Sequence, residues 1–110
     1  MPTTVSLPAR FYAGTLTNAE TGVWTVPAAE TDVVTSITVQ NITLAAQTFN
    51  VKMAGTFLAY QLSLPPQTFM TLDIKQVLNT AESILVTASN NNAITMFISG
   101  VKITSSLFEE

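Results

Sequence analysis

The sequence predicts an all-β protein, a seven- to eight-stranded antiparallel β-sandwich with Ig-like or jelly-roll topology. Hydrophobic and polar residues alternate with a period of two in one segment after another, and these segments are rich in Val, Ile and Thr. The 110 residues are enough for one domain. We place the sandwich at residues 9–103, between an N-terminal arm at residues 1–8 and a C-terminal tail at residues 104–110.

The predicted strands are short and follow one another closely. In residues 33–41, for example, the alternation places Val33 and Ile37 on one face and Val34 on the other. Stiff β-branched side chains of this kind suit a pleated, half-buried surface. The full set of predicted strands is residues 9–17, 23–26, 33–41, 49–53, 58–64, 70–75, 84–89 and 94–103.

The last predicted strand contains a change of parity. Three apolar residues share one face and two later ones have the opposite parity, namely Ile94, Met96 and Ile98 against Val101 and Ile103. An extra residue at Ser99-Gly100 would return all five to the core, so we predict a β-bulge there, because bulges tolerate Gly well. The alternative is a strand that crosses from one sheet to the other at this point.

Residues with turn chemistry separate the strands. Asn90-Asn91-Asn92 predicts one hairpin, because Asn tolerates positive φ, and Gly55-Thr56 predicts another. A hydroxyl residue, an aliphatic residue and Pro recur together at residues 6–8, 25–27 and 63–65. We expect each Pro to end a strand or to lie in an edge strand, because Pro cannot donate to a ladder. Residues 75–82 form either a helical turn or a loop between two sheets, and we favour the loop.

Composition excludes several classes of function. The chain has no Cys and no His, which rules out zinc fingers, iron–sulfur sites, disulfide scaffolds and catalysis by imidazole or thiolate. Only 10% of the residues are charged, and 38 of the 110 are Thr, Ser, Asn or Gln, so the polar surface is mostly hydroxyl and amide. The four cationic residues are scattered, so we expect no nucleic-acid partner. We find neither a signal peptide nor a membrane-spanning run, and expect no membrane partner.

The acidic residues form no catalytic arrangement. Asp73 lies on the polar face of a predicted strand, and Glu30 and Asp32 flank Thr31 in a predicted turn. That pair could bind a hard cation weakly, but we expect it to serve turn capping and solubility. We therefore predict a protein that is not an enzyme and that has neither a cofactor nor a metal site. Residues 41–43 match the N-glycosylation sequence, and we interpret them as the polar end of a strand.

Outward-facing apolar residues predict an interface. Phe69, Leu85 and Phe97 have the opposite parity to the core residues of their strands, so together they could form one patch. The alternative is that one of these strands is covered on both faces within a single chain. Low surface charge favours an assembled state, because burying such a surface costs little desolvation. In the tail, Leu107 and Phe108 are expected to anchor against a neighbouring subunit.

Residues 26–41, Val-Pro-Ala-Ala-Glu-Thr-Asp-Val-Val-Thr-Ser-Ile-Thr-Val-Gln-Asn, resemble a run found in small virion proteins of tailed bacteriophages. The resemblance continues at residues 48–51, 72–73 and 98–103, and covers residues 22–103 in all. One departure is Ala29, where those proteins usually have Gly after Pro-Ala. The resemblance implies an accessory structural protein of a phage particle, either a capsid decoration (cement) protein or a neck, tail or fibre module. It implies no catalytic or ligand-binding residue.

Two hypotheses follow. The first is a decoration protein, a homo-oligomer and by expectation a trimer, that binds the major capsid protein where capsid subunits meet and stabilises the assembled head. It would be made in the host cytoplasm and located on the virion surface. The second is a neck, tail or fibre module that binds host-surface carbohydrate through Trp24, Tyr12 or Tyr60. Hundreds of copies per particle would indicate decoration, and a handful would indicate the neck, tail or fibre.

Overall fold

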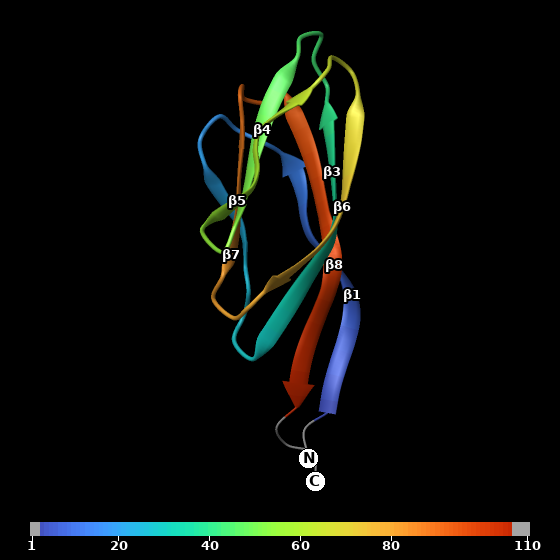
Figure 1. Cartoon of the computed structure of the whole chain (residues 1–110), viewed down its shortest axis with the longest axis vertical. Coiled ribbons are helices and arrows are strands. Elements are labelled where there is room, and N and C mark those ends of the chain that lie inside the picture. Colours follow the sequence, from blue (N-terminus) through green and yellow to red (C-terminus); the bar gives the residue numbers. More distant parts are fainter. Residues whose placement is uncertain (1–2, 107–110) are drawn as a thin grey trace.

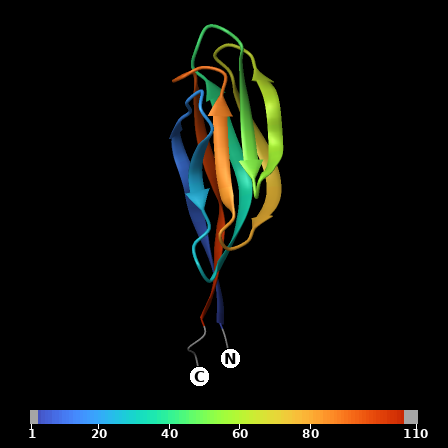
Figure 2. The ribbon, with the colours of Figure 1, turned by 90° about the vertical axis from the view of Figure 1, so that its left-hand side faces the viewer.

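Two four-stranded antiparallel sheets make up the fold, which confirms the β-sandwich prediction (Figures 1 and 2). The computed structural model describes the backbone of residues 3–106 and the side chains of residues 5–104, and it has no helix within that range. Sheet I has the order β1-β8-β3-β6, and sheet II has the order β2-β7-β4-β5. The strands are β1 (Thr3–Thr15), β2 (Thr21–Thr25), β3 (Glu30–Asn41), β4 (Gln47–Met53), β5 (Thr56–Leu64), β6 (Phe69–Leu78), β7 (Ser83–Ala88) and β8 (Ile94–Ser106).

The strand pairs are nested. Only β4 and β5 are neighbours both in sequence and in a sheet, whereas β3 pairs with β6, β2 with β7, and β1 with β8. Every other connection therefore passes from one sheet to the other. The predicted hairpin at Asn90-Asn91-Asn92 is wrong for this reason, because this loop leads from β7 in sheet II to β8 in sheet I. For residues 75–82 we favour a loop between the sheets. This loop is present at residues 79–82, whereas residues 75–78 belong to β6.

Turn and Pro chemistry agree with the predicted strand ends. The β4–β5 hairpin turns at Ala54-Gly55, with φ of 53° and 78°, which is the sign pattern of a type I′ turn. This confirms the hairpin predicted at Gly55-Thr56. Pro8 lies in β1 at the edge of sheet I, while β2 and β5 end just before the Val26-Pro27 and Pro65-Pro66 segments. Each of these Pro residues therefore lies in an edge strand or beyond the end of a strand, where its missing backbone N–H breaks no hydrogen bond between central strands.

The core lies between the two sheets. Inward-facing residues of both sheets are almost completely buried, including Ile37 and Ile98 from sheet I and Phe49 and Ile84 from sheet II. Met70, Leu72 and Ile74 of β6 pack against this core from the edge of sheet I and remain partly accessible. The alternation that predicted the strands is therefore the same alternation that fills the core.

β1 and β3 each carry one extra residue where they meet the middle of β8. The extra residue is Phe11 in β1 and Thr35 in β3, both beside Ser99, whereas β8 continues without interruption. The predicted irregularity is therefore at the right level of the sheet, but it lies in the two strands that flank β8. An extra residue of this kind bends its strand and exchanges the faces of the residues that follow it.

This arrangement overturns two sequence predictions. Val34 is completely buried and Val33 only partly, so Val33 does not share the core face with Ile37. In β8 the alternation is unbroken, and Val101 and Ile103 therefore lie on the outer face of sheet I and do not return to the core. A bulge in β8 would have turned these two residues inward, but the extra residues belong to its neighbours.

Gly100 and Lys102 take the inward positions of β8 below Ile98. A Cβ atom on Gly100 would collide with the Val33 carbonyl oxygen and lie 2.9 Å from the ring of Phe11, so only Gly allows β3 and Phe11 to approach this closely. The Nζ atom of Lys102 lies 4.6 Å from the centroid of the Trp24 ring in β2. Lys102 therefore covers the lower end of the core through a cation–π contact.

The first and last strands run to the end of the described chain side by side (Figure 1). Residues 3–8, assigned from the sequence to the N-terminal arm, form the first half of β1 and pair with residues 101–106 of β8. Residues 3–8 form a strand because they pair with β8, and their own sequence does not indicate this pairing. Residues 104–106, assigned to the tail, likewise belong to β8, and Leu107 and Phe108 lie outside the described residues.

The turn before β3 contains Ala29 with φ of 60°, in the left-handed region that favours Gly. Replacing Ala29 by Gly should raise the free energy of unfolding by about 1 kcal/mol, because it removes the contact between Cβ and the backbone. Urea unfolding followed by the fluorescence of Trp24, the one Trp of the chain, measures this change.

Ala28 is the matched control, since it is also exposed in the same turn but does not have positive φ. Ala28→Gly should lower the free energy of unfolding by about 0.5–1 kcal/mol through the entropy of the unfolded chain. Equal effects of the two substitutions would contradict the argument.

Candidate functional site

The outer face of sheet I has an uncharged centre, which the sequence and the register define together. None of the described outward side chains of the two central strands is charged. These side chains are Thr95, Phe97, Ser99, Val101 and Ile103 of β8 and Thr31, Val33, Ser36, Thr38 and Gln40 of β3. Such a surface can be covered by another molecule at little desolvation cost.

A lower apolar band crosses all four strands of this sheet. Pro8, Val101, Val33 and Val77 are directly opposite one another in the register of β1, β8, β3 and β6. Residues opposite one another in antiparallel strands share a face, so these side chains form a continuous row. Val77 at the β6 edge is 48% exposed. The sequence prediction missed this row, because the shift at Thr35 had to be known before Val33 could be placed outward.

An upper apolar band lies towards the other end of the same face. Phe97 is opposite Thr38 and Phe69 is opposite Gln40, so the two rings are on the same face with β3 between them. Phe69 is 71% exposed and Phe97 is 49% exposed. An open hollow of about 440 Å³ lies beside Phe97 and is lined by Ala13, Gly14, Thr15, Gln40, Thr95 and Phe97.

A polar row separates the two bands. Arg10, Ser99, Ser36 and Asp73 are opposite one another, so the two charges of this row lie on the edge strands β1 and β6. Asp73 is exposed and is the one acidic residue of this row, in agreement with the prediction that it lies on the polar face of its strand. The charges therefore frame the face at its edges and leave its centre neutral.

Leu85 does not belong to this surface. It lies in β7 of sheet II, where it is half-buried and is opposite Lys52 of β4. The outer faces of the two sheets point in opposite directions, as Figures 1 and 2 show. Of the three residues predicted to form one patch, the structure brings Phe69 and Phe97 to one face and places Leu85 on the other.

The loops at the upper end are held by Asn41, which is fully buried. Its Nδ2 donates to the carbonyl oxygens of Ala45, Leu64 and Pro65 at 2.8–3.2 Å, and its Oδ1 accepts from the amide and hydroxyl of Thr43 at 2.9 and 2.7 Å. Asn41 is therefore an interior bridge between the β3–β4 and β5–β6 connections. A buried amide with this set of bonds is unavailable as a sugar acceptor in the folded chain.

These loops add apolar surface above the upper band. Ile42 is 50% exposed and Leu44 is 81% exposed, in the segment directly after Asn41. The Gln67 amide donates to the Thr43 carbonyl at 3.1 Å, which fixes the two loops together next to Phe69 at the start of β6. The sequence prediction missed Ile42 and Leu44, because they lie outside the alternating strands.

Two of the three aromatic residues considered for sugar binding have structural roles. The Trp24 ring packs against Phe11 at 5.2 Å between centroids, and its Nε1 donates to Oδ2 of Asp32 at 2.8 Å. Tyr12 packs partly buried against the core. Tyr60 is the exception, since it is 61% exposed on β5 of sheet II. The three residues do not form one site.

Tyr60 instead meets Phe57, which the sequence prediction did not single out. The rings are 4.7 Å apart at 65°, and Nζ of Lys52 lies 4.9 Å from the Phe57 centroid. Lys52 also makes an ion pair with Glu20 at 3.3 Å. Gln61, with φ of 48°, and the irregular pairing of β4 with β5 interrupt the predicted alternation of β5 and turn Tyr60 outward.

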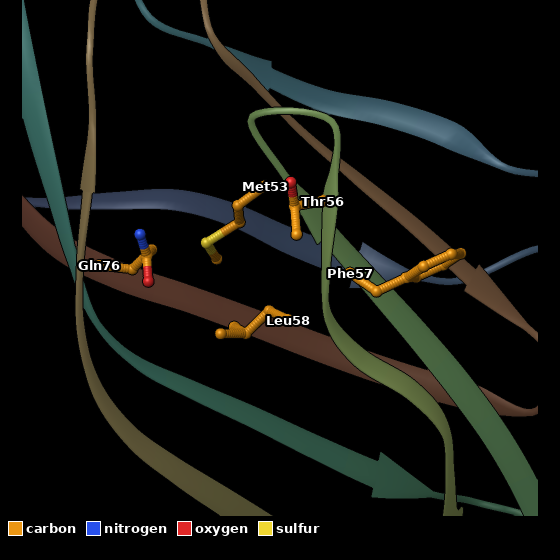
Figure 3. A pocket seen from close by; sticks show the side chains of 5 residues that line it. All are labelled: Met53, Thr56, Phe57, Leu58 and Gln76. Carbon is orange, nitrogen blue, oxygen red and sulfur yellow. The ribbon is translucent and has the colours of Figure 1, made fainter.

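A small cavity of about 90 Å³ lies between the sheet edges near this aromatic pair. Gln76 of β6 lies across it from Met53 and Leu58, while the Phe57 ring points away from the cavity (Figure 3). Small-molecule sites have volumes of about 300–1,000 Å³. This cavity is therefore too small for a ligand of that class.

Glu30 and Asp32 are not turn residues, contrary to the sequence prediction. They open β3 on its inner face, and Asp32 is completely buried. Burial raises the pKa of Glu30, the neighbouring Asp32 side chain and its charge raise it further, and Lys102 partly opposes the shift. Among the residues that the structure describes, no three acidic side chains gather to form a metal site.

No protein-family model matches the chain, and no curated protein is significantly similar to it. Residues 3–106 contain no helix that is both long and apolar enough to cross a membrane.

Asn41→Ala should lower the free energy of unfolding by about 3 kcal/mol, because it breaks the bonds of a fully buried amide to two connections and removes a donor from the buried Leu64 carbonyl. Asn50 is the matched control, since it is half-buried and its side chain accepts one bond, from the Gln61 amide. Asn50→Ala should cost about 1 kcal/mol. Urea unfolding compares the two, and similar losses would refute the bridging role of Asn41.

Proposed function

We propose that the protein is a structural, non-enzymatic component of a tailed-phage particle, and that it binds as a decoration (cement) protein to the assembled head. The observation that carries the proposal is the neutral outer face of sheet I, with its two apolar bands and its charges at the edges. The resemblance of residues 22–103 to small virion proteins supports the same conclusion.

The nested strand order adds support at the level of topology. We infer a jelly roll, because eight strands in two sheets with pairs β1·β8, β2·β7, β3·β6 and β4·β5 form two interlocked Greek keys. Jelly rolls occur in viral capsid domains and in lectins. This is an analogy of fold, and the function rests on the surface.

The size of the surface is consistent with a specific contact. Four strands at about 4.8 Å spacing and about ten residues at 3.3 Å give roughly 600 Å² for the flat area of the face. Stable interfaces bury about 800 Å² per partner, and the exposed Ile42 and Leu44 in the adjoining loop add apolar area to the flat estimate. In the proposed assembly this face contacts another copy of the chain or the major capsid protein.

The proposed mechanism is thermodynamic. A protein that binds only the assembled shell stabilises that shell by mass action, in proportion to the logarithm of its concentration over its dissociation constant. A trimer would present three such faces to the junction of capsid subunits, and Leu107 and Phe108 of the tail remain predicted anchors. The same contact could serve a neck or tail position, and quantitative mass spectrometry of purified particles distinguishes the two by copy number.

Phe69→Thr combined with Phe97→Thr should weaken self-association or particle binding at least tenfold. Thr keeps the strand propensity and matches neighbouring Thr38, so the fold should persist. Analytical ultracentrifugation of the free protein and co-sedimentation with particles measure the loss.

Tyr60→Thr is the control, since Tyr60 is an equally exposed aromatic residue on the other sheet. It should leave both measurements unchanged. If the double variant assembles and binds like the wild type, the outer face of sheet I is not the interface.

The second candidate function is recognition of host-surface carbohydrate, favoured by the exposed Phe57–Tyr60 pair beside Lys52. Aromatic faces pack against the apolar face of a sugar ring, and Lys52 is a donor for its hydroxyls. Tyr60→Ala should abolish binding on a glycan array while Phe97→Thr leaves it intact. An array without any binding by the wild type would exclude this function for the glycans tested.

A further inference from the structure

The lower end of the sandwich contains two enclosed carboxylate oxygens without partners. Glu30 and Asp32 lie two residues apart on the inner face of β3, so their side chains are neighbours on one side of the strand. Oδ2 of Asp32 accepts from Nε1 of Trp24 at 2.8 Å. Oδ1 of Asp32 and Oε2 of Glu30 are buried and have no donor.

Few charged groups face this pair. From β8, Lys102 is opposite Asp32, and its Nζ lies over the Trp24 ring. From β1, the residues opposite Lys102 and Thr104 are the apolar Leu7 and Val5. β2 contributes the uncharged Trp24, and the β6–β7 loop contributes an uncharged contact.

The contact from that loop is the Thr80 hydroxyl, which donates to the backbone carbonyl of Glu30 at 2.8 Å. Glu82 in the same loop accepts from the Asn79 amide at 2.7 Å. Asp32 and Lys102 are therefore the charged groups that act on Glu30.

Two ionised carboxylates in this position would repel each other and would leave two enclosed acceptors unsatisfied. One proton removes both problems, because a protonated carboxyl group donates to the neighbouring carboxylate. We propose that Glu30 is protonated in the folded protein at moderately acidic pH and donates its hydrogen to Oδ1 of Asp32. The chain Glu30–Asp32–Trp24 then connects sheet I to sheet II as a pH-sensitive latch.

The direction of the pH dependence follows from the environment. Burial, followed by the neighbouring Asp32, raises the pKa of Glu30 above its ordinary value of 4.5. The folded state therefore keeps its proton at pH values at which the unfolded chain has already lost it. The stability that the latch contributes is complete below pH 4.5, decreases as the pH rises through the raised pKa, and is lost above it.

Glu30→Gln tests the proposal, because the amide still donates to Asp32 but does not titrate. The equilibrium constant for unfolding of the wild type, relative to that of Glu30→Gln, should rise as the pH increases above 4.5, by up to about tenfold per pH unit. Urea midpoints followed by Trp24 fluorescence give this comparison. Asp73→Asn is the control, since it removes an exposed carboxylate of the same sheet and should keep the wild-type pH dependence.

A second measurement does not depend on whether the variant folds. NMR titration of the side-chain carboxyl carbon of Glu30 in the wild type should give an apparent pKa above 4.5, together with a change in the Trp24 Nε1 proton shift over the same pH range. A Glu30 carbon that titrates at or below 4.5 would overturn the proposal. So would a rise in the wild-type urea midpoint with calcium at neutral pH that Glu30→Gln abolishes, because the pair would then hold a cation.

Discussion

The position of Gly100 determines what the outer face of sheet I presents. β8 is paired with a strand on each side. The Val33 carbonyl and the Phe11 ring can approach β8 this closely only because Gly100 has no Cβ atom. The extra residues Phe11 and Thr35 in the flanking strands place Phe11 in the core and turn Val33 outward. The lower apolar band exists because of this local geometry, so packing inside the sandwich and the composition of its surface have one cause.

The distribution of charge follows from how few charges there are. With four cations and seven acids in 110 residues, each charged side chain has a large effect on the surface it occupies. Arg10 and Asp73 lie on edge strands, where they also protect unpaired backbone groups from pairing with another chain. Lys52 and Lys102 each cover an aromatic ring, and Glu30 and Asp32 are turned towards the interior. The centre of one outer face is thereby left neutral.

The sequence predicts the strands and the sandwich because alternation and turn chemistry are local signals. It does not predict which strands pair, since Asn90-Asn91-Asn92 has the same turn chemistry in a hairpin as in a connection between sheets. Parity arguments also fail wherever an irregularity intervenes, as at Thr35 for Val33 and at Gln61 for Tyr60.

The sequence predicts those residues of the candidate site whose face follows from the alternation of inward and outward positions along a regular strand. Phe69 and Phe97 were found because β6 and β8 alternate without interruption around them. Leu85 was equally well placed by parity, but parity does not say to which sheet a strand belongs. The pairing of Phe57 with Tyr60 and the burial of Asp32 depend on contacts between strands, for which the sequence carries no periodic signal.

The two outer faces differ in chemistry, and this difference bears on how the protein would sit on a particle. Sheet I presents neutral bands suited to burial, whereas sheet II presents Lys52, its ion pair with Glu20 and the exposed Tyr60 ring. Burying Lys52 would require its solvation to be replaced, which is costly, so sheet II is the better face to remain in water. A subunit bound through sheet I would therefore direct its aromatic pair outward. In that arrangement the proposed structural function and carbohydrate recognition would use opposite faces of one sandwich and would not compete for the same residues.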